Sequence, residues 1–217
     1  REQVAARRAF LDAGFYAPLA KAVCRTALEY APTARAILDV GCGEGYYSAQ
    51  IAHELPQAAL YGLDISKDAV RLAAGRYKSG VWLCATAAHL PFPEHSFDLL
   101  ISMFSLTVPK EFHRVLTPGG IFLQVLAAED HLLSLKQTIY PQLLHREKTF
   151  ASALPGFTLA ECKTIDFSFT VQDAQIRNLL AMTPHVWRIT RQGAERLAGL
   201  ERLTDRASVV IQVYRAG

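Results

Sequence analysis

Cysteine is scarce in this chain of 217 residues, and no two cysteines stand close together. The four of them are Cys24, Cys42, Cys84 and Cys162, and none belongs to a C-x-x-C pair. Structural zinc sites and disulfide frameworks need closely spaced or paired cysteines. We therefore expect no metal site, no disulfide framework, and a protein of the reducing cytoplasm.

Long apolar runs are also missing, since no stretch of eighteen apolar residues occurs. A transmembrane helix needs such a stretch, so we expect no membrane partner. The chain starts at Arg1 rather than Met and shows no charged-then-apolar leader, so we expect no signal peptide and a natural beginning that lies further upstream. With 51% hydrophobic and 20% charged residues, the composition is that of one globular α/β domain with an addition.

Acidic residues are few near the C-terminus. Residues 174–217 carry seven basic and three acidic groups (net +4), whereas residues 37–173 carry ten basic and fourteen acidic groups (net −4). Two interpretations are open, a phosphate-facing surface and ordinary solvated helix faces. The arginines concerned are Arg177, Arg188, Arg191, Arg196, Arg202 and Arg206.

Glycines alternate directly after the apolar run Ala36–Val40, giving D-x-G-x-G-x-G from Asp39 through Gly41, Gly43 and Gly45. A dinucleotide-binding fingerprint would need its third glycine at position 46, which is Tyr46. The spacing is instead typical of class I methyltransferases, which bind S-adenosylmethionine (SAM). Nineteen residues later Asp64 ends a second apolar segment, where a carboxylate can accept hydrogen bonds from both ribose hydroxyls. The alternative interpretation is a glycine-rich turn beside a surface aspartate.

Strand and helix patterns alternate along the first two thirds of the chain, which predicts a doubly wound, mostly parallel sheet of Rossmann-like class with N-terminal helices and an insertion before the last strand. We divide the chain into N-terminal helices (1–33), a cofactor-binding core (34–165), a helical substrate-facing insertion (166–206) and a final strand (207–217). Helices are predicted at 2–12, 16–30, 46–54, 67–76, 109–116, 130–148, 173–182 and 190–203. Strands are predicted at 36–40, 59–63, 81–84, 97–101, 121–126, 157–162, 165–171 and 207–214, with a turn at Pro118–Gly120.

Ligands of such sheets lie beyond the carboxyl ends of the strands. Besides the glycines and Asp64, this edge should carry residues that follow the second, third and fourth strands. Candidates for cofactor contacts there are Ile65, Ala87 and Ala88, and candidates for substrate contacts are Ser102 and Phe104.

Several blocks resemble the 23S ribosomal RNA (guanine-N1)-methyltransferases, from about Ala6 to the C-terminus. They are Ala6–Leu19, Gly41–Tyr47, Leu63–Lys67, Leu90–Phe92, Arg114–Leu116, Pro118–Gly120, His131–Leu132, Leu135–Lys136 and Met182–Pro184 with Trp187. The resemblance implies SAM as cofactor, S-adenosylhomocysteine as product and ribosomal RNA as partner. It assigns cofactor contacts to Tyr16, Gly43, Glu44 and His131, and some family members confer macrolide resistance.

Three departures from the family pattern concern the acceptor. The family's N-terminal zinc module has no counterpart here, either because the chain starts late or because the protein never had one. Leu106 stands where members tend to have proline, and Ala127–Asp130 replaces a Pro-Gly-Pro-like turn. A methyltransferase with a small-molecule substrate and a non-catalytic RNA- or partner-binding protein therefore remain alternatives, and a homodimer is left open.

Methylation of guanine N1 requires loss of a proton, and the candidates for the base are Asp130, His131 and Glu129, just past the fifth strand. The target base would have to be exposed and stacked on an aromatic side chain. Phe104 and Trp187, the latter with Arg188 beside it, are the candidates. Core packing is the favoured interpretation of Phe104, and for Trp187 the two roles are equally open.

Overall fold

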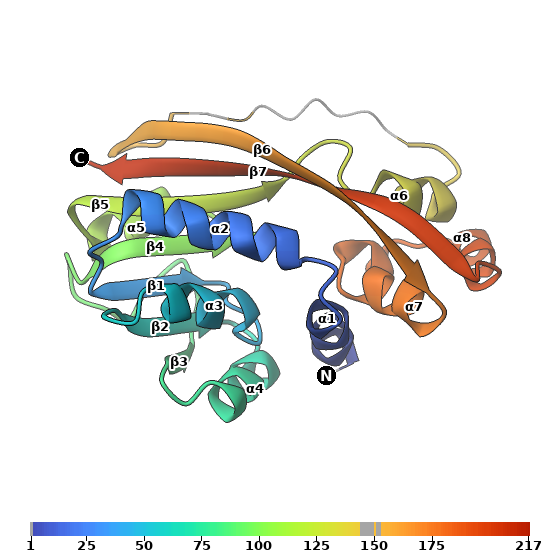
Figure 1. The fold of residues 1–217 in the computed structure, drawn as a ribbon, viewed down its shortest axis with the longest axis horizontal. Coiled ribbons are helices and arrows are strands. Elements are labelled where there is room, and N and C mark those ends of the chain that lie inside the picture. Colours follow the sequence, from blue (N-terminus) through green and yellow to red (C-terminus); the bar gives the residue numbers. More distant parts are fainter. Residues whose placement is uncertain (1, 144–149, 151–152) are drawn as a thin grey trace. The chain divides into compact units, whose positions relative to one another are not determined.

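The computed structural model describes residues 2–143, 150 and 153–217, and this part of the chain forms two compact units (Figure 1). The core unit comprises residues 19–126, 149–163 and 210–217. The accessory unit comprises residues 1–18, 127–148 and 164–209. These units cut across the four segments that the sequence suggests, and those segments remain a prediction.

The sheet contains seven strands in the order β3-β2-β1-β4-β5-β7-β6. The pairs β1–β2, β1–β4, β2–β3 and β4–β5 are parallel, and β7 runs opposite to β5 and β6 (Figure 1). This confirms the predicted doubly wound, mostly parallel sheet. The strands are β1 Ala36–Val40, β2 Ala59–Asp64, β3 Val81–Cys84, β4 Phe97–Met103, β5 Leu116–Ala127, β6 Phe157–Gln172 and β7 Arg202–Ala216.

Helices of the core unit cover both faces of its sheet. Helices α2 (Ala17–Tyr30) and α3 (Tyr46–Glu54) cross the face nearest the viewer in Figure 1, and α5 (Pro109–Val115) lies on the other side. Phe112 of α5 packs with Leu38, Leu100 and Phe122 of the central strands, all of them fully buried. Helix α4 (Lys67–Arg76) is capped as predicted, because Ser66 Oγ accepts a hydrogen bond from the Ala69 amide.

The accessory unit contains the other helices, together with the end of β6 and the beginning of β7. Helix α1 packs against α7, and α6 packs against α8, where a Cβ on Gly193 would lie 2.1 Å from the Ile139 carbonyl oxygen. Asp205 of β7 accepts hydrogen bonds from the amides of Ser134 and Leu135 and so satisfies the start of α6. The elements are α1 Glu2–Asp12, α6 Leu133–Ile139, α7 Ala174–Ala181, the 3₁₀ helix η1 Pro184–Trp187 and α8 Arg191–Ala198.

Some predicted boundaries were wrong. The two short strands predicted between 157 and 171 form one strand, β6, because no glycine or proline interrupts their alternation. The turn predicted at Pro118–Gly120 is an irregularity inside β5, where Gly119 takes a positive φ of 76°. Helix α8 stops at Ala198 because Gly199 caps it, and β7 then starts earlier than predicted. Helix α6 is shorter than predicted, and residues 144–148 of that prediction lie outside the described residues.

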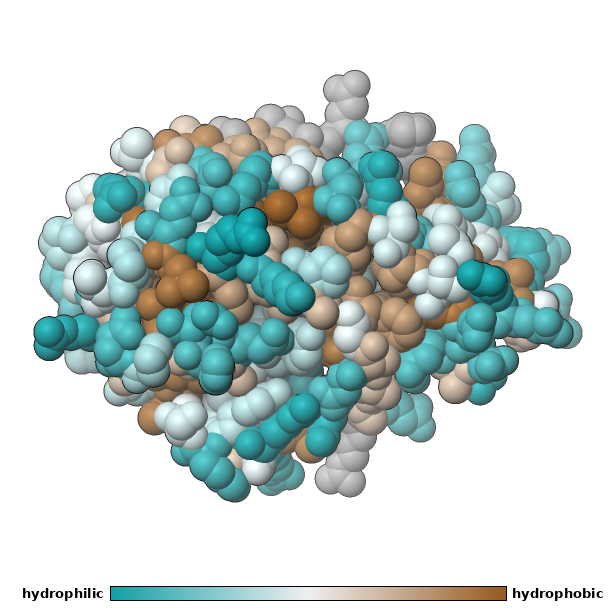
Figure 2. All heavy atoms as spheres, in the orientation of Figure 1, coloured by the Kyte–Doolittle hydropathy of each residue, from teal (hydrophilic) through white to brown (hydrophobic). Residues whose placement is uncertain are grey.

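The described surface is mainly hydrophilic on the face shown in Figure 2, with smaller hydrophobic patches. No helix among the described residues is long and apolar enough to cross a membrane.

A charged clamp fixes the Pro91–Pro93 loop to α5. Arg114 donates to the carbonyl oxygens of Leu90 and Phe92 and to both carboxylate oxygens of Glu111, while the Leu90 amide donates to Glu111 at 2.8 Å. The hydrogen bonds from Arg114 lower the pKa of Glu111 from 4.5 to about 2. The blocks Leu90–Phe92 and Arg114–Leu116, which resemble the family, thus have a structural role: they hold this loop against α5.

Replacing Glu111 by glutamine should therefore lower the free energy of unfolding at pH 7 by about 1–2 kcal/mol. The folded-state pKa lies below the ordinary value, so the contribution is present above pH 4.5 and is lost as the pH falls towards 2. Urea unfolding of both proteins between pH 2 and 7 measures this, and the difference between them should shrink on acidification. Glu29→Gln, an exposed change on α2, is the control and should give no such pH-dependent difference.

Candidate functional site

The glycine loop continues from β1 and is fastened to the end of β2. The amides of Gly41 and Cys42 both donate to the Leu63 carbonyl oxygen, at 2.7 and 3.0 Å. Gly41 has a φ of 83°, and a Cβ there would lie 2.2 Å from the Ser105 hydroxyl oxygen. Glycine is therefore required at position 41 both by the backbone conformation and by the loop after β4.

The two following glycines have different neighbours. Gly43 has a φ of 57°, and its amide donates to Asp64 at 2.9 Å. Gly45 has a φ of 82°, and a Cβ there would lie 2.7 Å from the Trp82 ring of β3. The space above Gly45 is thus filled by the protein itself. The sequence does not predict this contact, because nothing in the motif identifies a partner 37 residues away.

Asp64 accepts a hydrogen bond from the glycine loop and also lines a cavity at the carboxyl ends of the strands. One carboxylate oxygen accepts from the Gly43 amide, and the other accepts from the Ser66 amide at 2.8 Å. Because each carboxylate oxygen can accept more than one hydrogen bond, the group can still receive two hydroxyls. The adjoining cavity measures about 170 Å³ and is lined by Val40, Gly41, Leu63, Asp64, Ile65, Ala85, Thr86, Ala87, Ser105 and Leu106.

This cavity fits one part of the SAM molecule that the resemblance implies. Ile65 is 78% exposed and Leu106 67% exposed, so two apolar side chains border a carboxylate, as a base and a ribose require. At about 170 Å³ it is smaller than the roughly 300 Å³ at which whole small-molecule sites begin. Of the predicted cofactor residues, Gly41, Asp64, Ile65 and Ala87 line it. Ala88 is exposed just beyond the lining.

Asp39 and Glu44 are buried carboxylates, each 2% exposed. Asp39 accepts a hydrogen bond from Ser48 Oγ at 2.5 Å, which ties β1 to the first turn of α3. Glu44 lies inside the glycine loop, between Gly43 and Gly45. Burying a carboxylate costs free energy unless a cation or hydrogen-bond donors lie next to it. The cofactor could supply such groups, and both residues therefore remain proposals for cofactor contacts.

The acceptor candidates of the core unit lie at the end of β4. Ser102 is 1% exposed, and its hydroxyl oxygen has no hydrogen-bond partner among the described residues. Gln124 is the register neighbour of Ser102 on β5. Its side chain donates to Thr107, which lies in the loop between β4 and α5. Phe104 is 40% exposed and has a φ of 54°, a conformation that is unusual for a bulky residue.

Tyr16 and His131 contact each other inside the accessory unit, and both were predicted to be cofactor residues. The Ser208 amide donates to Nδ1 of His131 at 3.2 Å, so a neutral His131 carries its proton on Nε2. Nε2 lies 3.3 Å from the Tyr16 hydroxyl, and His131 can therefore donate to it. Burial, with Asp205 as a second cause, raises the pKa of Tyr16 and keeps its hydroxyl protonated. This arrangement favours a hydrogen-bonding role for His131 over proton abstraction.

Asp130 forms an ion pair with Arg206, which also lies 3.6 Å from Asp166. The pair is about half exposed, so Asp130 remains accessible although it is already paired. Glu129 accepts a hydrogen bond from Lys136 through its backbone carbonyl oxygen. On η1, Trp187 is 77% exposed, and Arg188 follows it directly.

Comparison with known proteins identifies the family of this site. Residues 37–120 match the model of the family described as "Methyltransferase domain". The 23S rRNA (guanine(748)-N(1))-methyltransferase of Streptomyces fradiae is 30% identical over 225 residues, covering 99% of this chain and 79% of that protein. The demethylmenaquinone methyltransferase of Geobacillus stearothermophilus is 34% identical over 116 residues, but that match covers only 48% of this chain. The YcgJ protein from Bacillus subtilis, with a TM-score of 0.55 and 16% identity, covers 90% of this chain and 98% of its own and supports the fold.

Proposed function

Because the chain belongs to the family of the 23S rRNA (guanine-N1)-methyltransferases, which are class I SAM-dependent enzymes, we propose that it methylates N1 of a guanine in 23S ribosomal RNA. SAM is the methyl donor, and S-adenosylhomocysteine is the product. The observation that carries the acceptor is the match to the Streptomyces fradiae enzyme along 99% of the chain, because it includes the accessory unit. A ribosomal substrate also implies action in the cytoplasm.

The core unit supplies the donor side of the reaction. Asp64 would accept the ribose hydroxyls, Ile65 and Ala87 would border the base, and Glu44 would face the ammonium of the methionine part. Asp39 and Gly43 to Gly45 hold the loop in place, as their contacts with Ser48, Asp64 and Trp82 indicate. Tyr16 and His131, which contact each other, are our further proposals for cofactor contacts.

The transfer is an in-line displacement in which the methyl–sulfur bond breaks and a bond from N1 to the methyl group forms. The N1 proton must leave, since neutral guanine has no available lone pair at N1. Asp130 is our proposal for its acceptor, with Arg206 as the positioning partner, and His131 would hold the neighbouring groups by donation.

The acceptor side is proposed to comprise Ser102, Phe104, Trp187 and Arg188. Trp187 offers an exposed ring for a base, and Arg188 a planar cation for phosphate. Arg191 and Arg206 already pair with acidic residues, and Arg196 donates to the Thr138 carbonyl oxygen. Of the arginine group, the candidates for RNA contacts are therefore Arg177, Arg188 and Arg202.

A second candidate function is methylation of a small apolar molecule. The exposed Leu106 beside the cofactor cavity favours it, because an apolar side chain gives a polar guanine edge no hydrogen bond. The partial match to a demethylmenaquinone methyltransferase is compatible with that chemistry.

Methyl-labelled SAM and unmodified 23S ribosomal RNA separate these functions. We expect label in the RNA, at a guanine where reverse transcription stops because the N1 methyl blocks base pairing. RNA that the enzyme has already modified should accept no further label. A protein that binds SAM in calorimetry but leaves the RNA unlabelled would favour the small molecule, and one that binds no SAM would be a non-catalytic member of the fold.

A further inference from the structure

The outer surface of the core unit holds a second cavity, which we call the α3–α4 groove. It measures about 570 Å³ and shares no residue with the cofactor cavity. That volume lies within the range of about 300–1,000 Å³ that is usual for small-molecule sites. The groove is lined by Tyr46, Ala49, Gln50, Ala52, His53, Leu60, Arg76, Tyr77 and Ser79.

The floor of the groove is apolar and its rim carries hydrogen-bond donors. Leu60, 4% exposed, lies among small alanines. Tyr46, Gln50 and His53 follow one another at spacings of four and three residues, so they share one side of α3. None of the lining residues is acidic, although Glu54 lies 3.8 Å from His53. An apolar floor bordered by cationic and neutral donors suits an aromatic anion.

The end of α4 holds the cation of the rim in a defined place. The Arg76 guanidinium carbon lies 5.2 Å above the centre of the Tyr77 ring, an arrangement that cation–π attraction stabilises. Trp82 donates from its ring nitrogen to the Tyr77 carbonyl oxygen at 2.8 Å, and the two rings lie 6.2 Å apart. A Cβ on Gly45 would lie 2.7 Å from the Trp82 ring and 3.0 Å from the Tyr77 ring. The wall of the groove is therefore held by these contacts and adjoins the glycine loop.

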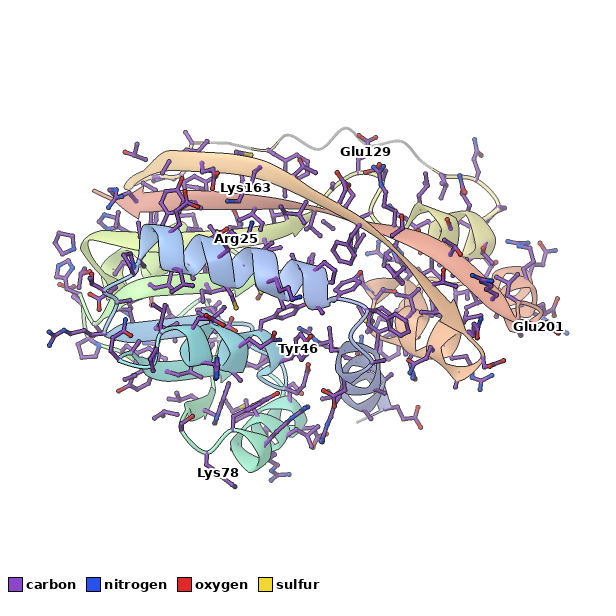
Figure 3. All side chains as sticks on the ribbon, viewed as in Figure 1. Arg25, Tyr46, Lys78, Glu129, Lys163 and Glu201 are labelled. Carbon is purple, nitrogen blue, oxygen red and sulfur yellow. The ribbon has the colours of Figure 1, made fainter. Side chains whose placement is uncertain are left out.

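We propose that the α3–α4 groove binds one nucleotide of single-stranded RNA, separate from the nucleotide that is methylated. Tyr46 and the apolar floor contact the base, while Arg76 and His53 contact its phosphate. The nucleotide chemistry follows from the groove itself, and its assignment to RNA rests on the proposed function. Tyr46 lies at the start of α3, and Lys78 follows the end of α4 with its ammonium group donating to the Ala74 carbonyl oxygen (Figure 3).

Trp82 provides a local reporter, because the chain contains only two tryptophans. In the Trp187→Phe variant its emission alone is observed while hexauridylate or uridine 5′-monophosphate is added at constant salt. We expect saturable quenching, with hexauridylate bound more tightly than the mononucleotide, because each hexamer offers six nucleotides to the one site. Arg76→Ala and Tyr46→Leu in the same background should each weaken binding about tenfold, as loss of one stacking or cation contact does.

Lys78→Ala is the matched control, since Lys78 carries the same charge two residues from Arg76 but does not line the groove. It should change the affinity less than twofold. Absence of saturable quenching with both probes, or quenching that neither groove variant weakens, would overturn the proposal. Equal affinity for the two probes would overturn the assignment to RNA. These outcomes do not depend on methyl transfer, so they are separate from failure of the labelling experiment.

Discussion

Replacing Gly41 by alanine is expected to lower the affinity for SAM by about 100-fold or more, because two costs of about 1–2 kcal/mol each combine. The first is the backbone, since alanine disfavours a φ of 83°. The second is steric, because the new Cβ would lie 2.2 Å from the Ser105 hydroxyl oxygen and 2.6 Å from its Cβ. The loop must then move away from Leu63 and Asp64, which its amides now contact. Calorimetric titration with SAM measures the loss.

Gly119→Ala separates the two costs. Gly119 has a φ of 76°, close to that of Gly41, but a Cβ there would meet no atom within 4 Å. This variant should lose about 1 kcal/mol of stability and bind SAM normally. The double variant Gly41→Ala/Ser105→Gly removes the clash alone and should recover part of the affinity. Normal SAM binding by Gly41→Ala would contradict the assignment of this loop to the cofactor.

The local parts of this fold follow from the sequence, because short-range signals determine them. Ser66 precedes α4 and caps it, and the apolar run at 36–40 forms β1 with the predicted bounds. The division of β6 into two strands was wrong, because the alternation of its residues continues from Phe157 to Gln172 with no glycine or proline to end it.

The donor side of the site was predictable for a similar reason, and the acceptor side was not. The glycines and Asp64 form a compact motif, and the structure joins them directly through the Gly43 amide. The Trp82 ring over Gly45, the Ser105 side chain against Gly41 and the positive φ of Phe104 all depend on distant segments. No local pattern in the sequence identifies such contacts.

Phe104 combines features that core packing does not explain. Its φ of 54° costs a bulky residue roughly 1–2 kcal/mol, yet its side chain stays 40% exposed. Its amide donates to the Val125 carbonyl oxygen at 2.9 Å, which fixes the conformation at the end of β4. Strain that the surrounding structure maintains tends to occur at functional positions. We propose that this ring is the platform on which the target guanine stacks.

Phe104→Asn should therefore lower kcat/KM for RNA methylation about 10- to 100-fold, the range that loss of one base–aromatic stack gives. Stability should change by less than about 1 kcal/mol, because asparagine tolerates the positive φ and so offsets the lost ring contacts. SAM affinity should stay within about threefold of the original, because Phe104 does not line the cofactor cavity. Phe104→Tyr should retain methylation, because tyrosine keeps the aromatic ring on which the base would stack. Single-turnover methylation, urea unfolding and calorimetry measure the three quantities.

His95→Asn is the matched control, because His95 also has a φ of 54° but lies before β4, away from the strands' carboxyl ends. It should leave methylation unchanged.

A Phe104→Asn variant that methylates RNA normally would show that the strain at position 104 serves the loop alone. The stack would then have to come from Trp187, whose replacement by leucine would lower kcat/KM instead. If both variants methylate normally, the target guanine is held without an aromatic platform, and the polar pair Ser102 and Gln124 becomes the part of β4 and β5 left to recognise it.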